Sequence, residues 1–193
     1  SMSTSPHAVN IRNGKKLGDT DLVDTMIKDG LWDAFNGYHM GVTAENVATK
    51  FQITRNDQDK FAFNSQKKAS KAQSEKKFDE EIVGFKIKSK KNEIIFNKDE
   101  HPRKETNMET LQKLKPVFQK EGTVTAGNAS GINDGAAAVL MMSSGEAEKR
   151  GIKKIARIKS WASCGVDPSL MGTGPIPSSK KALELAGWTA KDL

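Results

Sequence analysis

The spacing of apolar and polar positions predicts a succession of helices along the chain. The clearest helix is expected over 55–76, where small residues recur at steps of three or four, from Ala62 and Ser65 to Ala69 and Ala72. Lysines at 67, 68, 71, 76 and 77 lie on the remaining surface, and Thr54 with Asp57 after it predicts an N-cap with an acidic first turn. Shorter helices are predicted over 19–29, 43–51, 107–114, 146–150 and 178–186, and Thr43 is expected to cap the second of these.

Short apolar runs predict strands between these helices. Segments 82–88 and 93–97 are expected to form a hairpin, with 89–92 as its turn. The run 136–142 suits a buried strand or a helix, and its shortness and the glycines before it favour a strand. Segment 155–164 also has strand character, and 31–41 suits a packed loop. The pattern indicates a helical region over about 25–120, followed by a mixed α/β segment.

Composition narrows the class of protein. With 36% hydrophobic and 28% charged residues, the chain holds enough apolar material for a core. No apolar run approaches the length of about 20 residues that spans a bilayer, and the first ten residues lack the features of a signal peptide. The single cysteine, Cys164, excludes an internal disulfide and a multi-cysteine metal site, and three histidines without close spacing argue against a histidine zinc site.

The positive charge is concentrated in one third of the chain. Residues 60–120 contain 16 Lys and Arg against 9 Asp and Glu, while the rest contains 15 of each. Such a region attracts nucleic acid, an anionic membrane or a phosphorylated small ligand, and a solvated lysine-rich face explains it equally well. Nucleic acid is disfavoured because aromatic residues are scarce and fit core positions better than a base-stacking surface: Phe61, Phe63, Phe78, Phe85 and Phe96.

Few residues are candidates for chemistry on sequence grounds alone. Segment 126–135, AGNASGINDG, allows close approach of the backbone to a ligand, although a turn without a ligand fits as well. His39 lies in an apolar loop, where a packed histidine is commoner than a catalytic one. Cys164 would need a nearby base and an electropositive setting to act as a nucleophile, and the sequence specifies neither.

Several long motifs resemble those of one enzyme family. KDGLWDAFNGYHMGVTAENVA, LKPVFQKEGTVTAGNASGINDGAAAVLMMS, SWASCGVDPSLMGTGPIP and KALELAGW are similar to the middle of a biosynthetic thiolase, an acetyl-CoA acetyltransferase. The resemblance covers essentially residues 1–193 and implies an incomplete thiolase-like α/β fold. It assigns 1–121 mainly to the inserted, α-rich loop domain with its β-hairpin. Within this domain, about 8–24 would form the tetramerisation arm and about 25–121 the basic part that binds coenzyme A.

The resemblance assigns the remaining residues to the two halves of a thiolase. It implies that 122–152 end the N-terminal half and that 153–193 begin the C-terminal half. The acylated cysteine, the Asn-Glu-Ala-Phe motif, the Gly-His-Pro histidine and the second cysteine of the family would all lie outside this chain. We therefore expect a fragment without catalytic residues that is inactive on its own, and Cys164 matches neither family cysteine.

The resemblance implies a coenzyme A-binding role for this chain in the condensation of two acetyl-CoA to acetoacetyl-CoA, or in the reverse thiolysis. Thr110 stands where the family usually has serine, and Val117 where it usually has alanine. A basic domain would attract the phosphates of coenzyme A, and small residues would leave a channel for its pantetheine arm. The implied binding residues, of which Leu31, Met40, Phe118, Ser130 and Met171 would wall one slot, are Leu31, His39, Met40, Arg103, Thr110, Val117, Phe118, Ala126, Ser130 and Met171.

Two alternatives remain open: part of a degradative 3-ketoacyl-CoA thiolase, or a non-catalytic coenzyme A-binding or assembly module completed by separate chains. For the intact enzyme the resemblance implies a homotetramer. We expect coenzyme A thioesters as substrates rather than a bound cofactor, no metal, and neither nucleic acid nor membrane as partner. A cytoplasmic location is expected, and any targeting peptide would precede Ser1.

Overall fold

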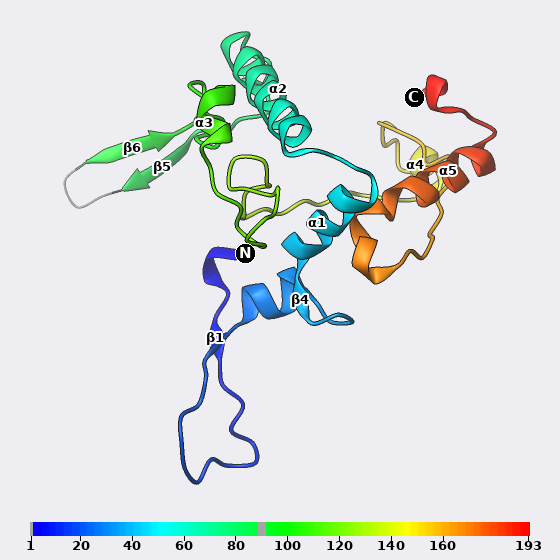
Figure 1. Ribbon diagram of the computed structural model, residues 1–193. Coiled ribbons are helices and arrows are strands. Elements are labelled where there is room, and N and C mark those ends of the chain that lie inside the picture. Colours follow the sequence, from blue (N-terminus) through cyan, green and yellow to red (C-terminus); the bar gives the residue numbers. More distant parts are fainter. Residues whose placement is uncertain (1, 89–91) are drawn as a thin grey trace. The chain divides into compact units, whose positions relative to one another are not determined.

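The computed structural model describes residues 2–88 and 92–193, which form two compact units (Figure 1). Unit 1 comprises Ser1–Val47 and Ile132–Leu193, and unit 2 comprises Ala48–Gly131. The boundaries of these units differ from those of the three segments implied by the family resemblance, 1–121, 122–152 and 153–193. That division refers to the complete enzyme and stays a prediction.

Unit 2 is built around the helix that the sequence predicted most clearly. Helix α2 (Arg55–Ser74) begins at Thr54, whose side chain accepts a hydrogen bond from the backbone N–H of Asp57, and the Asp57 carboxylate accepts one from the Thr54 backbone in return. The short helix α3 (Met108–Gln112) starts in the same way, at Asn107. Both predicted helices therefore form, and α3 packs against α2 (Figure 1).

The predicted hairpin forms in unit 2, but its phenylalanines are not in a core. Strands β5 (Phe85–Lys88) and β6 (Glu93–Phe96) pair antiparallel, with Phe85 opposite Phe96, and residues 89–91 of the predicted turn lie outside the described residues. Both strands are exposed along their length, and Phe85 is 70% exposed. Phe61 is 79% exposed because it follows the buried Asp59 by two residues, or about 200° around α2. Phe78 and Phe96 are also exposed, at 38% and 45%, and Phe63 is half-buried, so the predicted core positions are wrong for four of the five phenylalanines.

Unit 1 consists of short strands and helices. Two antiparallel pairs form, β1 with β2 and β3 with β4, and a long exposed loop over 9–22 joins the first pair (Figure 1). Its elements are η1 (Met2–Thr4), β1 (His7–Ala8), β2 (Val23–Asp24), η2 (Met26–Leu31), β3 (Trp32–Asp33), β4 (Tyr38–His39), α1 (Met40–Lys50, whose last turn enters unit 2), α4 (Ser144–Lys149), η3 (Pro168–Thr173), α5 (Pro175–Ala186) and η4 (Ala190–Asp192).

Four predictions for unit 1 are corrected. The helix expected over 19–29 is replaced by β2 and the single turn η2, and the packed loop over 31–41 contains the β3–β4 hairpin. Thr43 does not cap α1, which starts at Met40, and its buried hydroxyl donates to the Met40 carbonyl inside the helix at 2.6 Å. Helix α5 starts at Pro175 because proline has no N–H to lose in a first turn. Its end at Gly187, with φ of 68°, is as predicted.

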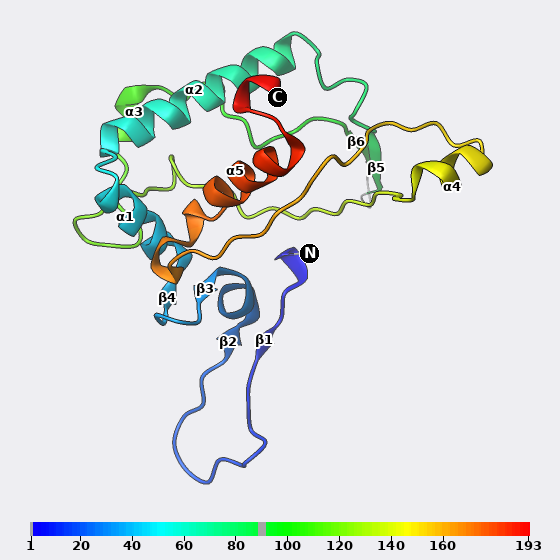
Figure 2. The ribbon, with the colours of Figure 1, turned by 90° about the vertical axis from the view of Figure 1, so that its right-hand side faces the viewer.

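The two strands predicted beside α4 do not form. Residues 136–142 and 155–164 have no regular structure, and Figure 2 draws them as the coil that leads into and out of α4. Their apolar side chains lie in solvent, with Val139 81%, Ile155 100% and Trp161 80% exposed. A strand needs a neighbour to pair its backbone N–H and C=O groups, and no described residue supplies one here. Among the described residues, no helix is long and apolar enough to cross a bilayer.

Candidate functional site

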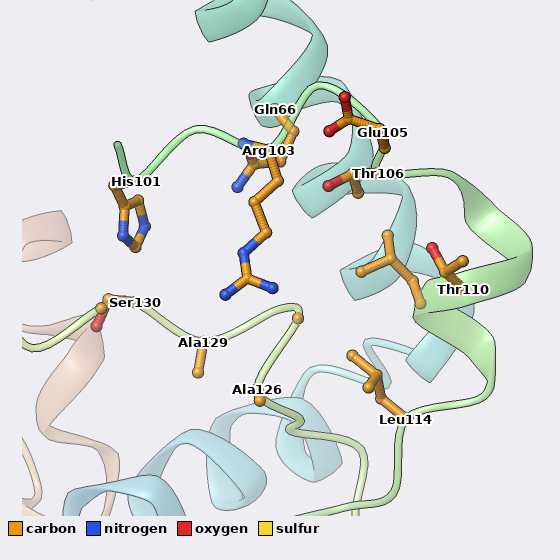
Figure 3. Close-up of a pocket in the computed structure, with 13 residues that line it drawn as sticks. Gln66, His101, Arg103, Glu105, Thr106, Thr110, Leu114, Ala126, Ala129 and Ser130 are labelled. Atoms are coloured by element: carbon orange, nitrogen blue, oxygen red, sulfur yellow. The ribbon is translucent and has the colours of Figure 1, made fainter. Parts of the chain in front are cut away.

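A cavity of about 510 Å³ opens in unit 2 between α2, α3 and the loop that follows Thr125 (Figure 3). This volume lies in the range of small-molecule sites. Polar groups, small residues and two leucines share its walls, so it offers both hydrogen bonds and apolar contact. The lining residues are Gln66, His101, Arg103, Glu105, Thr106, Thr110, Leu111, Leu114, Ala126, Gly127, Ala129, Ser130 and Gly131.

Arg103 is the main cationic group of the cavity. Its backbone N–H donates to Oε1 of Gln66 on α2 at 2.8 Å, which fixes the start of its side chain. Figure 3 shows the guanidinium reaching across the cavity toward the loop that carries Ala126 and Ala129. A guanidinium that points into a cavity can form two parallel hydrogen bonds with a phosphate group.

Helix α3 forms a second wall. The backbone N–H of Thr110 donates to Oδ1 of Asn107 at 2.9 Å, and the Thr110 hydroxyl donates to the Asn107 carbonyl at the same distance. The hydroxyl that the family resemblance places at the ligand therefore also closes the N-terminus of α3. At the other end of the helix, Nη2 of Arg55 donates to the carbonyls of Leu111 and Leu114 at 2.7 and 3.0 Å.

The loop after Val124 forms the third wall, and it contains the segment singled out as a candidate ligand loop. Thr125 is fully buried, and its backbone N–H donates to Oδ1 of Asn128 at 2.7 Å. The side-chain amide of Asn128 donates to the Thr123 carbonyl and to the carboxylate of Asp59, both at 3.0 Å. Ala126 and Ser130 are left exposed on the cavity side (Figure 3).

Four of the ten predicted binding residues line this one cavity: Arg103, Thr110, Ala126 and Ser130. Val117 and Phe118 belong to the same unit but do not line it. The backbone N–H of Val117 donates to the Val124 carbonyl at 3.0 Å, so Val117 supports the base of the loop, and Phe118 is half-buried.

The other four predicted residues lie in unit 1, where Leu31, His39 and Met40 follow one another through the β3–β4 hairpin into α1. Nδ1 of His39 accepts a hydrogen bond from the Gly41 backbone at 3.0 Å, so the proton of a neutral ring is on Nε2. Met171, in η3, is exposed. The slot walled by Leu31, Met40, Phe118, Ser130 and Met171 draws on both units and remains a prediction.

Asp33 shapes the turn that leads to His39. Its carboxylate accepts hydrogen bonds from the side-chain amide of Asn36 at 2.7 Å and from the backbone N–H of Phe35 at 2.8 Å. The bond from the Asn36 side chain, followed by those from the backbone, lowers the pKa of Asp33 below its ordinary value of 3.8. The ionised carboxylate therefore stabilises this turn.

Sequence reasoning missed the polar residues that hold the cavity together, chiefly Asp59, Gln66 and Asn128. A signal was present: Arg55, Asp59 and Gln66 share the face of α2 that also carries Ala62 and Ala69. Polar side chains on an otherwise small-residue face indicate buried hydrogen bonding rather than a solvated surface. Within the described ranges, no group of His, Cys, Asp and Glu is arranged to hold a metal ion.

Comparison with known proteins decides the family. The model of the thiolase N-terminal domain matches residues 1–145, and that of the thiolase C-terminal domain matches residues 152–193. The chain belongs to the thiolase family. The acetyl-CoA acetyltransferase of Rhizobium meliloti (strain 1021) is 58% identical over 193 residues, which are 100% of this thiolase chain and 49% of that protein.

Solved thiolases share the fold. The crystal structure of the Bacillus anthracis acetyl-CoA acetyltransferase matches with a TM-score of 0.90 at 42% identity, over 100% of this chain and 49% of that one. The crystal structure of human mitochondrial 3-ketoacyl-CoA thiolase in complex with CoA matches with a TM-score of 0.89, also at 42% identity, over 100% and 48%. The thiolase chain thus has an incomplete thiolase fold and spans about half the length of the relatives it matches.

Proposed function

We propose that this chain binds coenzyme A thioesters as the central, coenzyme A-binding part of an acetyl-CoA C-acetyltransferase. The observation that carries the proposal is that Arg103, Thr110, Ala126 and Ser130 line one cavity in the basic unit. A human thiolase of similar fold has been crystallised with CoA, which supports the same ligand class here.

The residues of the cavity have separate tasks in this proposal. The Arg103 guanidinium meets a phosphate of the nucleotide, and the surrounding lysines add a long-range attraction that salt weakens. Ala126, Ala129 and Gly131 leave room for a slender chain, while the Ser130 hydroxyl offers it a hydrogen bond. The acetyl-cysteine of the complete enzyme forms on a residue outside this chain, so the chain by itself has no acetyl transfer.

Calorimetric titration with coenzyme A tests the binding role. We expect Arg103→Ala to weaken binding about tenfold, since a hydrogen bond to a charged group is worth about 1.5–3 kcal/mol. Lys104→Ala is the matched control, because Lys104 is the exposed neighbour that does not line the cavity. Equal affinity of the wild type and Arg103→Ala would contradict the proposed role of this cavity. Acetyl transfer by the isolated chain would contradict the assignment of catalysis to residues outside it.

The degradative thiolase is the second candidate, because a 3-ketoacyl-CoA thiolase matches the fold as well as the acetyltransferases do. Curated relatives at 51–59% identity carry the acetyltransferase name, which favours the short-chain reaction. Competition of acetoacetyl-CoA against a long-chain acyl-CoA for the cavity separates the two. Tighter binding of the long-chain acyl-CoA would favour the degradative thiolase.

The loop over 9–22 supports the proposed tetramer of the intact enzyme. It extends from the β1–β2 pair, and its apolar Leu17 is 91% exposed (Figure 1). Together with Ile11 and Leu22 of the same loop, which are also exposed, Leu17 offers apolar surface for burial against a second copy. In the assembled enzyme, Leu17→Glu is expected to lower the sedimenting mass, whereas Lys16→Glu at the adjacent position is not.

A further inference from the structure

Helix α2 carries three polar side chains on a single face, and one of them, Gln66, lines the cavity. Arg55, Asp59 and Gln66 are spaced by four and seven residues, which places them within about 40° of one another around the helix axis. Gln66 holds the backbone of Arg103, as described above. The other two residues form a network that reaches the remaining walls.

Asp59 is the centre of this network. Its side chain is fully buried, Oδ2 accepts from Nε of Arg55 at 2.8 Å, and Oδ1 accepts from Nδ2 of Asn128 at 3.0 Å. A buried carboxylate is stable only when it is paired and hydrogen-bonded, and removal of one partner costs more than a surface ion pair is worth. Each oxygen of Asp59 is thus committed to a different neighbour.

Arg55 and Asn128 contact different walls of the cavity. Arg55 donates onward to the carbonyls of Leu111 and Leu114 at the C-terminal end of α3, where carbonyls accept hydrogen bonds from side-chain donors. Asn128 holds the loop through Thr123 and Thr125. One carboxylate therefore connects the end of α3 to the loop.

These walls meet at a close approach. A methyl group added at Gly127 would lie 2.5 Å from Cδ2 of Leu111 and 2.6 Å from Cδ1 of Leu114. Since all three residues line the cavity, the distance between α3 and the loop sets the shape of this end of the site.

We propose that Asp59 is a positioning residue that sets the spacing of the cavity walls, through Arg55 on one side and Asn128 on the other, and thereby the affinity for the ligand. Asp59 does not line the cavity, so it acts through these residues. The part that concerns affinity rests on the proposed binding of coenzyme A, whereas the spacing itself can be tested without a ligand.

A double-mutant cycle provides the test. Asp59→Asn keeps the size of the side chain, but whichever way its amide is turned, the single remaining oxygen cannot accept from both Arg55 and Asn128. Asn128→Ala removes the link to the loop and leaves the Arg55–Asp59 pair in place. We expect each change to weaken coenzyme A binding about tenfold. The double variant should bind about as weakly as either single variant, because both changes break the same connection between α3 and the loop. Losses that multiply would show independent effects and overturn the proposal.

Amide hydrogen exchange separates positioning from general destabilisation. In Asp59→Asn and Asn128→Ala we expect the Thr125 amide, which donates to Asn128, to exchange at least about tenfold faster. The central amides of α2 should stay within about twofold of the wild type. Asp79→Asn, which removes an exposed carboxylate of the same unit, is the control.

The outcomes distinguish the two proposals. If the wild type fails to bind coenzyme A, the proposed function fails, and selective acceleration at Thr125 still supports the role of Asp59 in wall spacing. If the wild type binds and Asp59→Asn binds equally well, the positioning role fails. Uniform acceleration along α2 would also overturn it, since Asp59 would then be a stability residue only.

Discussion

The side-chain amide of Asn46 donates a hydrogen bond to the backbone carbonyl of Ser169 at 3.1 Å, across 123 positions of the chain. The same amide group donates to the hydroxyl of Tyr38 at 3.2 Å. One residue of α1 thus joins the β3–β4 hairpin to η3, and so connects the segments of unit 1 that carry His39 and Met171.

Asn46→Ala is expected to loosen η3. Loss of two side-chain hydrogen bonds at a half-buried site should lower the free energy of unfolding by about 1–2 kcal/mol. Amide exchange at Leu170 and Gly174 should quicken more than exchange within α5. Thr49→Ala, an exposed position of the same helix, is the control. Unchanged exchange in η3 would contradict the connecting role of Asn46.

Gly127→Ala is expected to destabilise the chain through crowding. The φ of Gly127 is not in the left-handed region, so the backbone tolerates alanine and the cost arises from the contact with Leu111 and Leu114. Overpacking of this kind costs about 1–3 kcal/mol, which urea unfolding measures. Gly135→Ala is the matched control because its added methyl group meets open space. A neutral result at Gly127 would mean that the leucines move apart freely.

The start of α2 is expected to weaken in acid. The hydrogen bond from the Thr54 side chain, at 2.6 Å, and that from the Thr54 backbone, at 3.1 Å, hold the pKa of Asp57 below its ordinary value of 3.8. Because the pKa is lower in the folded state, the cap stabilises the fold fully above about pH 3.8 and loses this contribution as the pH falls through the folded-state value.

An NMR titration of the Asp57 carboxyl group, with helicity followed in parallel, measures this effect. In Asp57→Asn, the helicity at the start of α2 should no longer fall as the pH is lowered through the pKa of Asp57. In Asp79→Asn, this acid-dependent loss of helicity should remain. A carboxyl group at position 57 that titrates at or above 3.8 would contradict the capping geometry.

The apolar segments beside α4 are expected to be reachable from solvent in the isolated chain. Trp161 is 80% exposed and Trp188 is 39% exposed, so acrylamide should quench a variant that retains only Trp161 more strongly than one that retains only Trp188. Exposed apolar side chains on a backbone without strand partners also favour self-association of the isolated chain. Shielding of Trp161 at low protein concentration would show that another part of the chain covers it.

The sequence by itself determined the elements whose signals are local. The cap at Thr54 and the stop at Gly187 act within a few residues, and they predict the start of α2 and the end of α5. Helices α3 and α4 were also predicted, but their caps at Asn107 and Ser143 were found only in the structure. The motifs also sufficed for the family, because their order along the chain identifies a thiolase without reference to packing.

Only the tertiary structure decided which side chains meet at the cavity and which predicted strands form. Asp59 and Asn128 lie 69 positions apart, and nothing local to either residue indicates the other. Segments 136–142 and 155–164 were predicted as strands from local features, but a strand exists only when a neighbouring backbone pairs with it. Thr43 is a residue type that often caps helices, yet it lies inside α1. Local propensity acts through adjacent residues, whereas burial and strand pairing depend on partners that the fold brings from elsewhere.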